Sequence, residues 1–301
     1  MRYSFLIVVS NSEVEAYQRC HKAHWYAYGL KLTQRTQSMP LRCGILGHSV
    51  MEAYYRAKQA EYTHTEAVEA GMDVIAEYII SDHDETTDAE VLPIVTQRFL
   101  EYTLYYKNEP WRIIDVEGVY NIPLGGGVTY ALTLDLLVEI IRGPFVGEQA
   151  IIDHKWTHDF WTPTAIQMAA QIPKYLWTLN KLGSTARIGF LNQIRYRKMK
   201  DESPDKIFRR VLIDPTQQRM DNIMSVQKKM AIEIANLKLL GKAHLLAEAT
   251  PSYSKSTCDK CNFVAPCNIE TDGRDATDTL RTMFKPNTYD YTEVKLRRNL
   301  E

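Results

Sequence analysis

The sequence predicts one domain of mixed α/β (α+β) class, in which a sheet is flanked by helices. Helical periodicity fills residues 12–108, and short β-branched or alternating runs gather in residues 111–214. A long helical pattern and a cysteine-rich segment follow in residues 215–270. Because no repeat or linker separates these three subregions, we expect residues 1–301 to form a single domain.

The elements can be justified in order along the chain. Residues 1–10 are too short for a signal peptide and lack a small-residue cleavage site, so they are expected to form a first strand. Ser12 and Glu15 have the spacing of a capping box for the first helix. Glycines at 125–127 and the turn at 142–144 predict an antiparallel meander. The predicted core strands are 113–122, 128–141, 150–156, 188–198 and 207–213, with helices at 163–183 and 215–240.

Composition limits the classes of protein. The chain is 45% hydrophobic, enough for a substantial core, and no apolar run is long enough to span a bilayer. Its five cysteines, an odd number, indicate a reducing interior, and a cytoplasmic location is expected. The formal net charge of −1 does not by itself indicate a nucleic-acid partner, although the charge is unevenly distributed.

Two acidic residues stand inside apolar strand-like runs. Asp135 follows Leu134, and Asp153 is followed two residues later by Lys155. An unpaired carboxylate costs several kcal/mol to bury, roughly, so a shared cation is the economical explanation. The period of a strand puts Asp153 and Lys155 on one face. This pattern is typical of a metal-dependent phosphodiesterase, although Asp-x-Lys also occurs at ordinary strand ends.

The helix predicted at 163–183 carries a polar stripe. Gln167, Gln171 and Tyr175 recur every four residues and therefore share one face. The stripe is consistent with a helix edge at an active site, and also with an ordinary amphipathic helix. Pro173 falls in the middle of this helix, where a kink is expected.

Cys258, Cys261 and Cys267 lie in a short polar segment. Three thiols need a fourth ligand to complete a tetrahedral or cluster site, and nothing nearby supplies one. The fourth must come from Cys20 or Cys43, far away in the sequence. On the residues alone, zinc, an iron–sulfur cluster and unliganded reduced thiols all stay open.

The densest basic region follows the predicted strand at 188–198. It contains Arg195, Tyr196, Arg197 and Lys198, and its interleaved aromatic residue would suit a groove that tracks a nucleic-acid backbone. A solvated strand edge protected by cations explains the same residues.

Taken together, Asp135, Asp153-x-Lys155 and Gln171-x-x-x-Tyr175 resemble the PD-(D/E)XK nuclease superfamily, and its RecB-type exonuclease branch in particular. The resemblance implies a restriction-endonuclease-like core with a mixed central sheet in residues 111–214. It also implies Mg²⁺ or Mn²⁺ held by Asp135, Asp153 and the backbone carbonyl of His154. Lys155 would orient the attacking water, and Gln171 and Tyr175 would position the strand.

The resemblance adds two weaker candidates. Gly44-x-x-x-His48 is similar to a helical family motif in which the histidine is a further metal ligand, a role that favours Mn²⁺. A lone helical histidine is otherwise usually a packing residue. Glu117 occupies the place of a family acidic residue that can assist at the site.

RecB-type nucleases that carry an iron–sulfur cluster use one N-terminal and three C-terminal cysteines. The segment from Ser10 to Cys20 resembles their N-terminal pattern, although His21 replaces the family's proline. By this resemblance, a [4Fe–4S] cluster on Cys20, Cys258, Cys261 and Cys267 would join the two ends of the chain. Cys43 lacks the family's surroundings.

The resemblance as a whole implies a DNA exonuclease acting on single-stranded DNA in recombination, repair or end processing. CRISPR-associated and phage-encoded stand-alone members imply helicase, recombination or CRISPR-adaptation partners, with a phage-infected bacterial host as one setting. Two other classes stay open: a cluster-containing DNA-binding adaptor with weak or absent cleavage, and a zinc-stabilised nuclease acting on RNA or duplex. Visible absorption separates iron from zinc.

Overall fold

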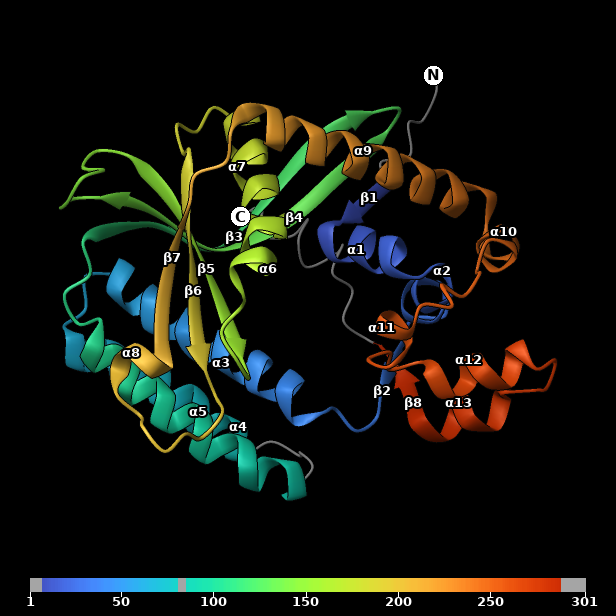
Figure 1. The fold of residues 1–301 in the computed structure, drawn as a ribbon, viewed down its shortest axis with the longest axis horizontal. Helices are drawn as coiled ribbons and strands as arrows, with labels where there is room; N and C mark the ends of the chain where they lie inside the picture. The colour runs from blue at the N-terminus through green and yellow to red at the C-terminus, as the bar shows by residue number, and fades with distance from the viewer. Residues whose placement is uncertain (1–6, 81–84, 288–301) are drawn as a thin grey trace. The chain divides into compact units, whose positions relative to one another are not determined.

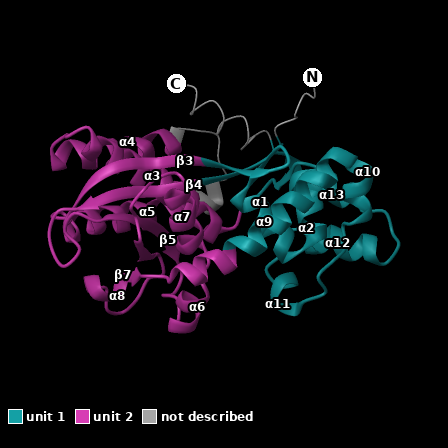
Figure 2. Cartoon of the chain, turned by 90° about the horizontal axis from the view of Figure 1, so that it is seen from above, with its two compact units in different colours: residues 1–36, 121–132, 224–301 teal, residues 37–120, 133–223 magenta. Residues whose placement is uncertain are grey.

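The computed structural model describes residues 7–80 and 85–287. The chain forms two compact units, each assembled from segments far apart in the sequence (Figure 2). Unit 1 contains residues 1–36, 121–132 and 224–301, and unit 2 contains residues 37–120 and 133–223. The part of the predicted first strand that falls in residues 1–6 lies outside the described residues.

A mixed sheet organises the fold (Figure 1). Its strand order is β1-β4-β5-β6-β7, and β3 pairs with β4. The β1–β4 and β5–β6 pairs are parallel, whereas β4–β5 and β6–β7 are antiparallel, so the predicted mixed sheet and α/β class are confirmed. The strands are β1 Ile7–Ser10, β3 Trp111–Gly125, β4 Val128–Ile140, β5 Gln149–Thr157, β6 Ile188–Arg195 and β7 Phe208–Ile213.

The sheet of unit 2 has helices on both faces (Figure 1). On one face, the ring of His154 in β5 stacks on Tyr55 of α3, with ring centroids 5.4 Å apart. On the other face, a Cβ at Gly189 of β6 would lie 2.6 Å from Ile172 of α7, so α7 packs closely there. The helices are α3 Met39–Gln59, α4 His64–Ile80, α5 Glu85–Tyr105, α6 Pro163–Met168, α7 Gln171–Lys181 and α8 Pro204–Ile207.

Strand pairing assigns the side chains to these two faces. Ile151 pairs with Gly189, Asp153 with Leu191 and Lys155 with Gln193, so these residues share the face that α7 covers. The intervening residues of β5 face α3 and α5. The alternation explains how one strand carries both a polar site and core residues.

The helix predicted at 163–183 is two helices, and the difference accounts for Pro173. The α6 helix ends at Met168, and Ala169 adopts an extended conformation before α7 begins at Gln171. Pro173 therefore lies in the first turn of α7, where a missing N–H breaks no helical hydrogen bond. No mid-helix kink is needed.

Unit 1 is largely helical and has its own small core around Cys20, Trp25, Tyr26, Phe263 and Phe284. Ser10, rather than Ser12, caps the first helix: its side chain accepts a hydrogen bond from the Glu13 N–H at 3.1 Å. The elements are α1 Asn11–Arg19, α2 His21–His24, the π-helix η1 Trp25–Gly29, β2 Leu32–Gln34, α10 Lys242–Ala247, α11 Lys255–Cys258, α12 Val264–Thr271, α13 Thr277–Met283 and β8 Phe284–Pro286, together with most of α9 Gln217–Leu240. Strands β2 and β8 pair antiparallel.

Among the described residues, no helix combines the length and apolar character needed to cross a membrane.

Candidate functional site

The candidate active site begins where β4 and β5 separate. Their pairing runs to Leu136 and Ile152. Beyond this pair, a side chain takes the place of a main-chain acceptor: Asp135 Oδ2 accepts a hydrogen bond from the His154 N–H at 2.6 Å. The carboxylate is thereby held in place, with its Oδ1 left toward His48. Burial raises the pKa of Asp135, but nearby His48, Lys155 and the His154 N–H outweigh it, so the net shift is downward.

Asp153 and Lys155 form the second part of the site. Asp153 is 1% exposed, and the Lys155 Nζ lies 2.9 Å from both of its carboxylate oxygens. Only the contact with Oδ1 has hydrogen-bond geometry, so the buried Oδ2 is without a hydrogen-bond partner among the described residues. Burial, together with Asp135, raises the pKa of Asp153 to about 6 against the opposing effect of Lys155. A divalent cation would satisfy Oδ2 and compensate the buried charge.

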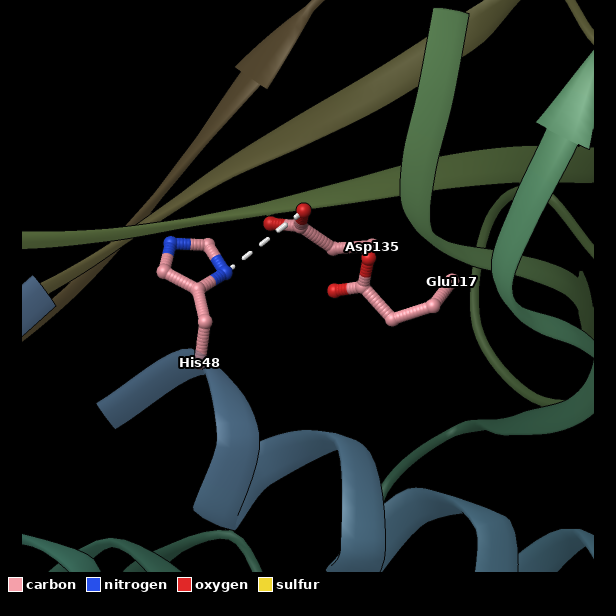
Figure 3. A group of neighbouring side chains, drawn as sticks. All are labelled: His48, Glu117 and Asp135. Atoms are coloured by element: carbon pink, nitrogen blue, oxygen red, sulfur yellow. Dashed lines mark ion pairs between the residues drawn. The ribbon is translucent and has the colours of Figure 1, made fainter. Parts of the chain in front are cut away.

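His48, Glu117 and Asp135 converge on one point (Figure 3). Each offers a ligand atom, and these three atoms all lie within 4.8 Å of one another. His48 Nδ1 is 3.7 Å from Asp135 Oδ1, and both side chains are partly exposed. One nitrogen and several carboxylate oxygens make a ligand set that suits Mn²⁺ or Mg²⁺. The structure therefore places His48 beside the predicted carboxylates.

The position of His48 depends on Gly47. A Cβ at Gly47 would lie 2.2 Å from Cε2 of Trp156, so only glycine allows α3 to approach β5 this closely. By contrast, a Cβ at Gly44 would meet nothing within 4 Å. The glycine of the sequence motif is thus not the one that this packing requires.

Glu117 reaches the site through a local distortion of β3. Its φ of 49° is in the left-handed region, which costs a glutamate of order 1 kcal/mol or more and is typical of functional positions. Beside it, a Cβ at Gly118 would lie 2.0 Å from Asp115 Oδ2, which accepts a hydrogen bond from Tyr120. A glycine directly after an acidic residue in a strand pattern is the signal that could have strengthened this candidate.

Gln171 and Tyr175 are adjacent, as the helical spacing predicts. Gln171 Nε2 donates to Tyr175 Oη at 2.5 Å, and Gln171 lines a small cavity together with Asp153. Gln167 is exposed on α6 and does not continue this stripe, because the chain breaks between the two helices.

A buried polar network behind the site was not identified from the sequence. Asn192 Nδ2 lies 2.7 Å from His154 Nδ1 and donates to Tyr102 Oη at 3.0 Å. Arg210 binds both Asn192 and Glu109, and Tyr55 also donates to Glu109. Burial lowers the pKa of His154 to about 3, so its ring is neutral. The network fixes β5 from the face opposite the carboxylate.

The four residues of the predicted basic region have different surroundings. Tyr196 is 5% exposed and packs in the core, so its ring is not available for stacking on a base. Arg197 pairs with Asp159 at 2.8 Å, and Lys198 is exposed. Arg195 is partly buried, and its guanidinium lies over the ring of Phe160.

The predicted cysteine ligands meet in unit 1. Cys20, Cys258, Cys261 and Cys267 line one small cavity. Burial raises the pKa of the Cys261 and Cys267 thiols, and the nearby Cys20 adds to the effect on both. Cys43 is fully buried in the core of unit 2 and takes no part.

Comparison with known proteins gives one family. The family model of the PD-(D/E)XK nuclease superfamily matches residues 8–268. No curated protein matches the chain. Among solved structures, one described as a "putative exonuclease" from Eubacterium rectale is 10% identical, with a TM-score of 0.44, over 83% of this chain and 87% of that one. The structure of SSO0001 is 14% identical, with a TM-score of 0.33, over 71% of this chain and 79% of that one.

Proposed function

Because the chain belongs to the PD-(D/E)XK nuclease superfamily, we propose that it is a metal-dependent DNA exonuclease that hydrolyses single-stranded DNA in recombination, repair or end processing. The observation that carries the proposal is the buried Asp153–Lys155 pair beside the convergent His48, Glu117 and Asp135. The preference for single-stranded DNA and the cellular process rest on the resemblance to RecB-type exonucleases.

Each side chain has a defined task in this proposal. Asp135, Asp153, Glu117, His48 and the backbone carbonyl of His154 would hold Mg²⁺ or Mn²⁺. A bound ion would stabilise the charge that develops on the phosphate and acidify the attacking water. Lys155, whose ammonium donates a hydrogen bond to Asp153 Oδ1 at 2.9 Å, would orient that water. The His154 N–H keeps Asp135 oriented throughout.

Gln171 and Tyr175 would act on the substrate rather than on the water. They are joined by a hydrogen bond, and Gln171 lines the same cavity as Asp153. Their polar groups can therefore position the phosphodiester in front of the nucleophile, which is the contribution of alignment to catalysis.

We further propose that Cys20, Cys258, Cys261 and Cys267 bind a [4Fe–4S] cluster. Their convergence on one cavity supports a shared site, and the choice of a cluster over zinc rests on the resemblance to RecB-type nucleases. Since a metal bound only by the folded state stabilises that state, the cluster would stabilise unit 1.

End-labelled single-stranded and double-stranded DNA, digested with Mg²⁺ or Mn²⁺, tests the activity. We expect progressive shortening of the single strand and no cleavage in EDTA. Lys155→Ala should reduce the rate at least about a hundredfold without loss of folded protein. Binding without cleavage by the unmodified protein would favour the adaptor alternative, and digestion of RNA or duplex alone would favour the zinc-stabilised nuclease.

A further inference from the structure

Two arginines of unit 2 lie over one aromatic ring next to the candidate active site. Phe160 belongs to the loop that connects β5 to α6. The guanidinium carbon of Arg195 is 4.1 Å from the centre of its ring, and that of Arg209 is 4.5 Å away. Two like charges are thus held close together on a shared support.

Neither guanidinium forms an ion pair with a carboxylate of the described residues. Among the described residues, no acidic oxygen lies within ion-pair distance of Arg195 or Arg209. Asp159 interacts electrostatically with Arg195, but its ion pairs are with Arg197 at 2.8 Å and His158 at 2.7 Å. Burial and the neighbouring Arg195 lower the pKa of Arg209, which reflects the cost of this uncompensated charge.

Existing contacts fix the two side chains but leave donors unused. Arg209 Nη2 donates to the Trp161 carbonyl at 2.5 Å, and Arg195 Nη1 donates to the Lys206 carbonyl at 3.1 Å. Both Nε atoms are buried without a hydrogen-bond partner within the described part of the chain. Because a guanidinium offers five N–H donors in a rigid fork, each still has donors for an oxyanion.

Gln193 is a third, independent indication. Its side chain is fully buried, and its Oε1 accepts the Trp161 N–H at 2.6 Å and an N–H of Arg209 at 3.3 Å. These contacts settle the orientation of the amide, since the oxygen faces two donors. Its Nε2 is left as a buried donor with no acceptor in the described residues. An anion held by the two arginines could accept a hydrogen bond from this buried donor.

The strand register connects these residues with the active site. Lys155 pairs with Gln193, and Gln193 pairs with Arg209, so the three form a row on one face of the sheet. Arg195 lies two residues further along the same face. One small cavity is lined by both Asp153 and Trp161, so the loop that carries Phe160 borders the catalytic carboxylate.

We propose that Arg195, Arg209 and Gln193 form a phosphate-binding subsite that holds a backbone phosphodiester of the substrate strand, near but distinct from the scissile one. The inference rests on the proposed function, which supplies the substrate. The arginine forks match the geometry of phosphate oxygens, and Phe160 keeps them oriented. The subsite would fix the register of the strand, so that one linkage reaches Asp153 and Lys155 while a neighbour is held.

Binding can be measured without cleavage by placing each change in the Lys155→Ala background with Mn²⁺. Fluorescence anisotropy with a labelled single-stranded oligodeoxynucleotide should show about a tenfold weaker Kd for Arg195→Gln and for Arg209→Gln. Changing both should lower the slope of log Kd against log salt by about 1.4, as expected for two lost contacts with a single strand. Arg187→Gln is the matched control. It removes an exposed arginine that precedes the first residue of β6, whereas Arg195 is the last residue of that strand, and it should leave Kd unchanged.

To locate the contact, one phosphodiester of the oligodeoxynucleotide at a time is replaced by a neutral methylphosphonate, and Kd is measured with protein that keeps both arginines. One position should weaken binding about tenfold, and the same replacement should have no further effect in Arg195→Gln. If no position couples to either arginine, the subsite does not exist as proposed. Arginine-dependent binding of inorganic phosphate, without any linkage dependence on the strand, would also overturn it. Coupled binding by a protein that never cleaves DNA would retain the subsite and refute the proposed exonuclease.

Discussion

The two candidate metal centres are built in opposite ways. In unit 2, the carboxylates lie on neighbouring strands and are oriented by protein contacts, such as the 2.6 Å hydrogen bond from the His154 N–H to Asp135. In unit 1, the thiols come from both ends of the chain, and Cys258 and Cys267 lie on helices of four and eight residues. Short helices have little stability of their own. Unit 2 therefore orients its candidate ligands through protein contacts, whereas the proposed cluster would itself help to order unit 1.

The largest effect should come from removing a thiol ligand. Cys20→Ser should abolish the visible absorption of anaerobically purified protein and lower its Tm by about 10 °C, because metal-binding energy is also folding energy. Cys43→Ala should keep the colour and cost only about 1–2 kcal/mol, since it removes a buried sulfur from the core of unit 2. A colourless Cys43→Ala beside a coloured Cys20→Ser would reverse the ligand assignment.

The next effect concerns how unit 2 holds its site. Gly47→Ala forces a methyl group against Trp156 and should destabilise the protein by about 1–3 kcal/mol while reducing cleavage. Gly44→Ala enters open space and should stabilise α3 by up to about 1 kcal/mol with unchanged activity. Urea unfolding and cleavage rates measure both. Equal behaviour of the two variants would contradict the close approach of α3 to β5.

A third comparison tests whether His48 is a metal ligand or a packing residue. Because its side chain is one-third exposed, His48→Ala should leave Tm nearly unchanged while raising the Mn²⁺ concentration for half-maximal cleavage about ten- to a hundredfold. His24→Ala is a useful contrast, because that buried imidazole contacts Glu13 at 3.1 Å and its loss should lower Tm. Overlapping Mn²⁺ titrations for the parent and His48→Ala would remove His48 from the site.

The smallest effect is the dependence on pH. Asp153 must be ionised to bind metal, and its pKa in the metal-free fold is raised to about 6 from an ordinary 3.8. Apparent Mn²⁺ affinity should therefore fall up to about tenfold per pH unit below 6. Stability of the metal-free protein should move the other way and rise as pH falls from about 7 toward 4, because the folded state retains a proton that the unfolded state releases. Asp153→Asn should remove this rise, and denaturant melts across the range would show it.

Sequence patterns were most informative for the strands of the core, where apolar residues indicate burial. Apolar, β-branched runs predicted β5, β6 and β7 to within a few residues of their observed ends, and Asp153 and Lys155 share a face as expected. Two helix starts were misplaced by the local patterns. Ser12 looked like a helix cap, but Ser10 forms the cap, and Pro173 looked like a kink until the break before α7 explained it.

The rest of the site depends on pairings between distant segments, which a local pattern does not record. Glu117 of β3 and His48 of α3 meet beside Asp135, at a point where β3 adopts a positive φ. Arg209 and Phe160 are 49 positions apart. They meet because β7 pairs with β6 and because the loop between β5 and α6, which carries Phe160, lies against Arg209. Tyr196 stands among basic residues, as an aromatic residue of a nucleic-acid-binding site would, but its side chain is buried. Adjacent residues of an extended segment point in opposite directions, so Tyr196 does not share a face with its basic neighbours.

The alternation of side chains along β5 also limits where residues can be inserted or deleted in this part of the chain. Inserting or deleting one residue between Ile151 and Lys155 would exchange the two faces, turning the carboxylate and lysine toward the core and His154 and Trp156 outward. The turn between β4 and β5 lies outside this alternation, and a Cβ at Gly143 or Gly147 would meet nothing within 4 Å, so residues added beside these glycines would find space. Homologues should therefore differ more in the length of this turn than across β5, and in a length-scanning library cleavage should be lost abruptly for insertions or deletions within β5.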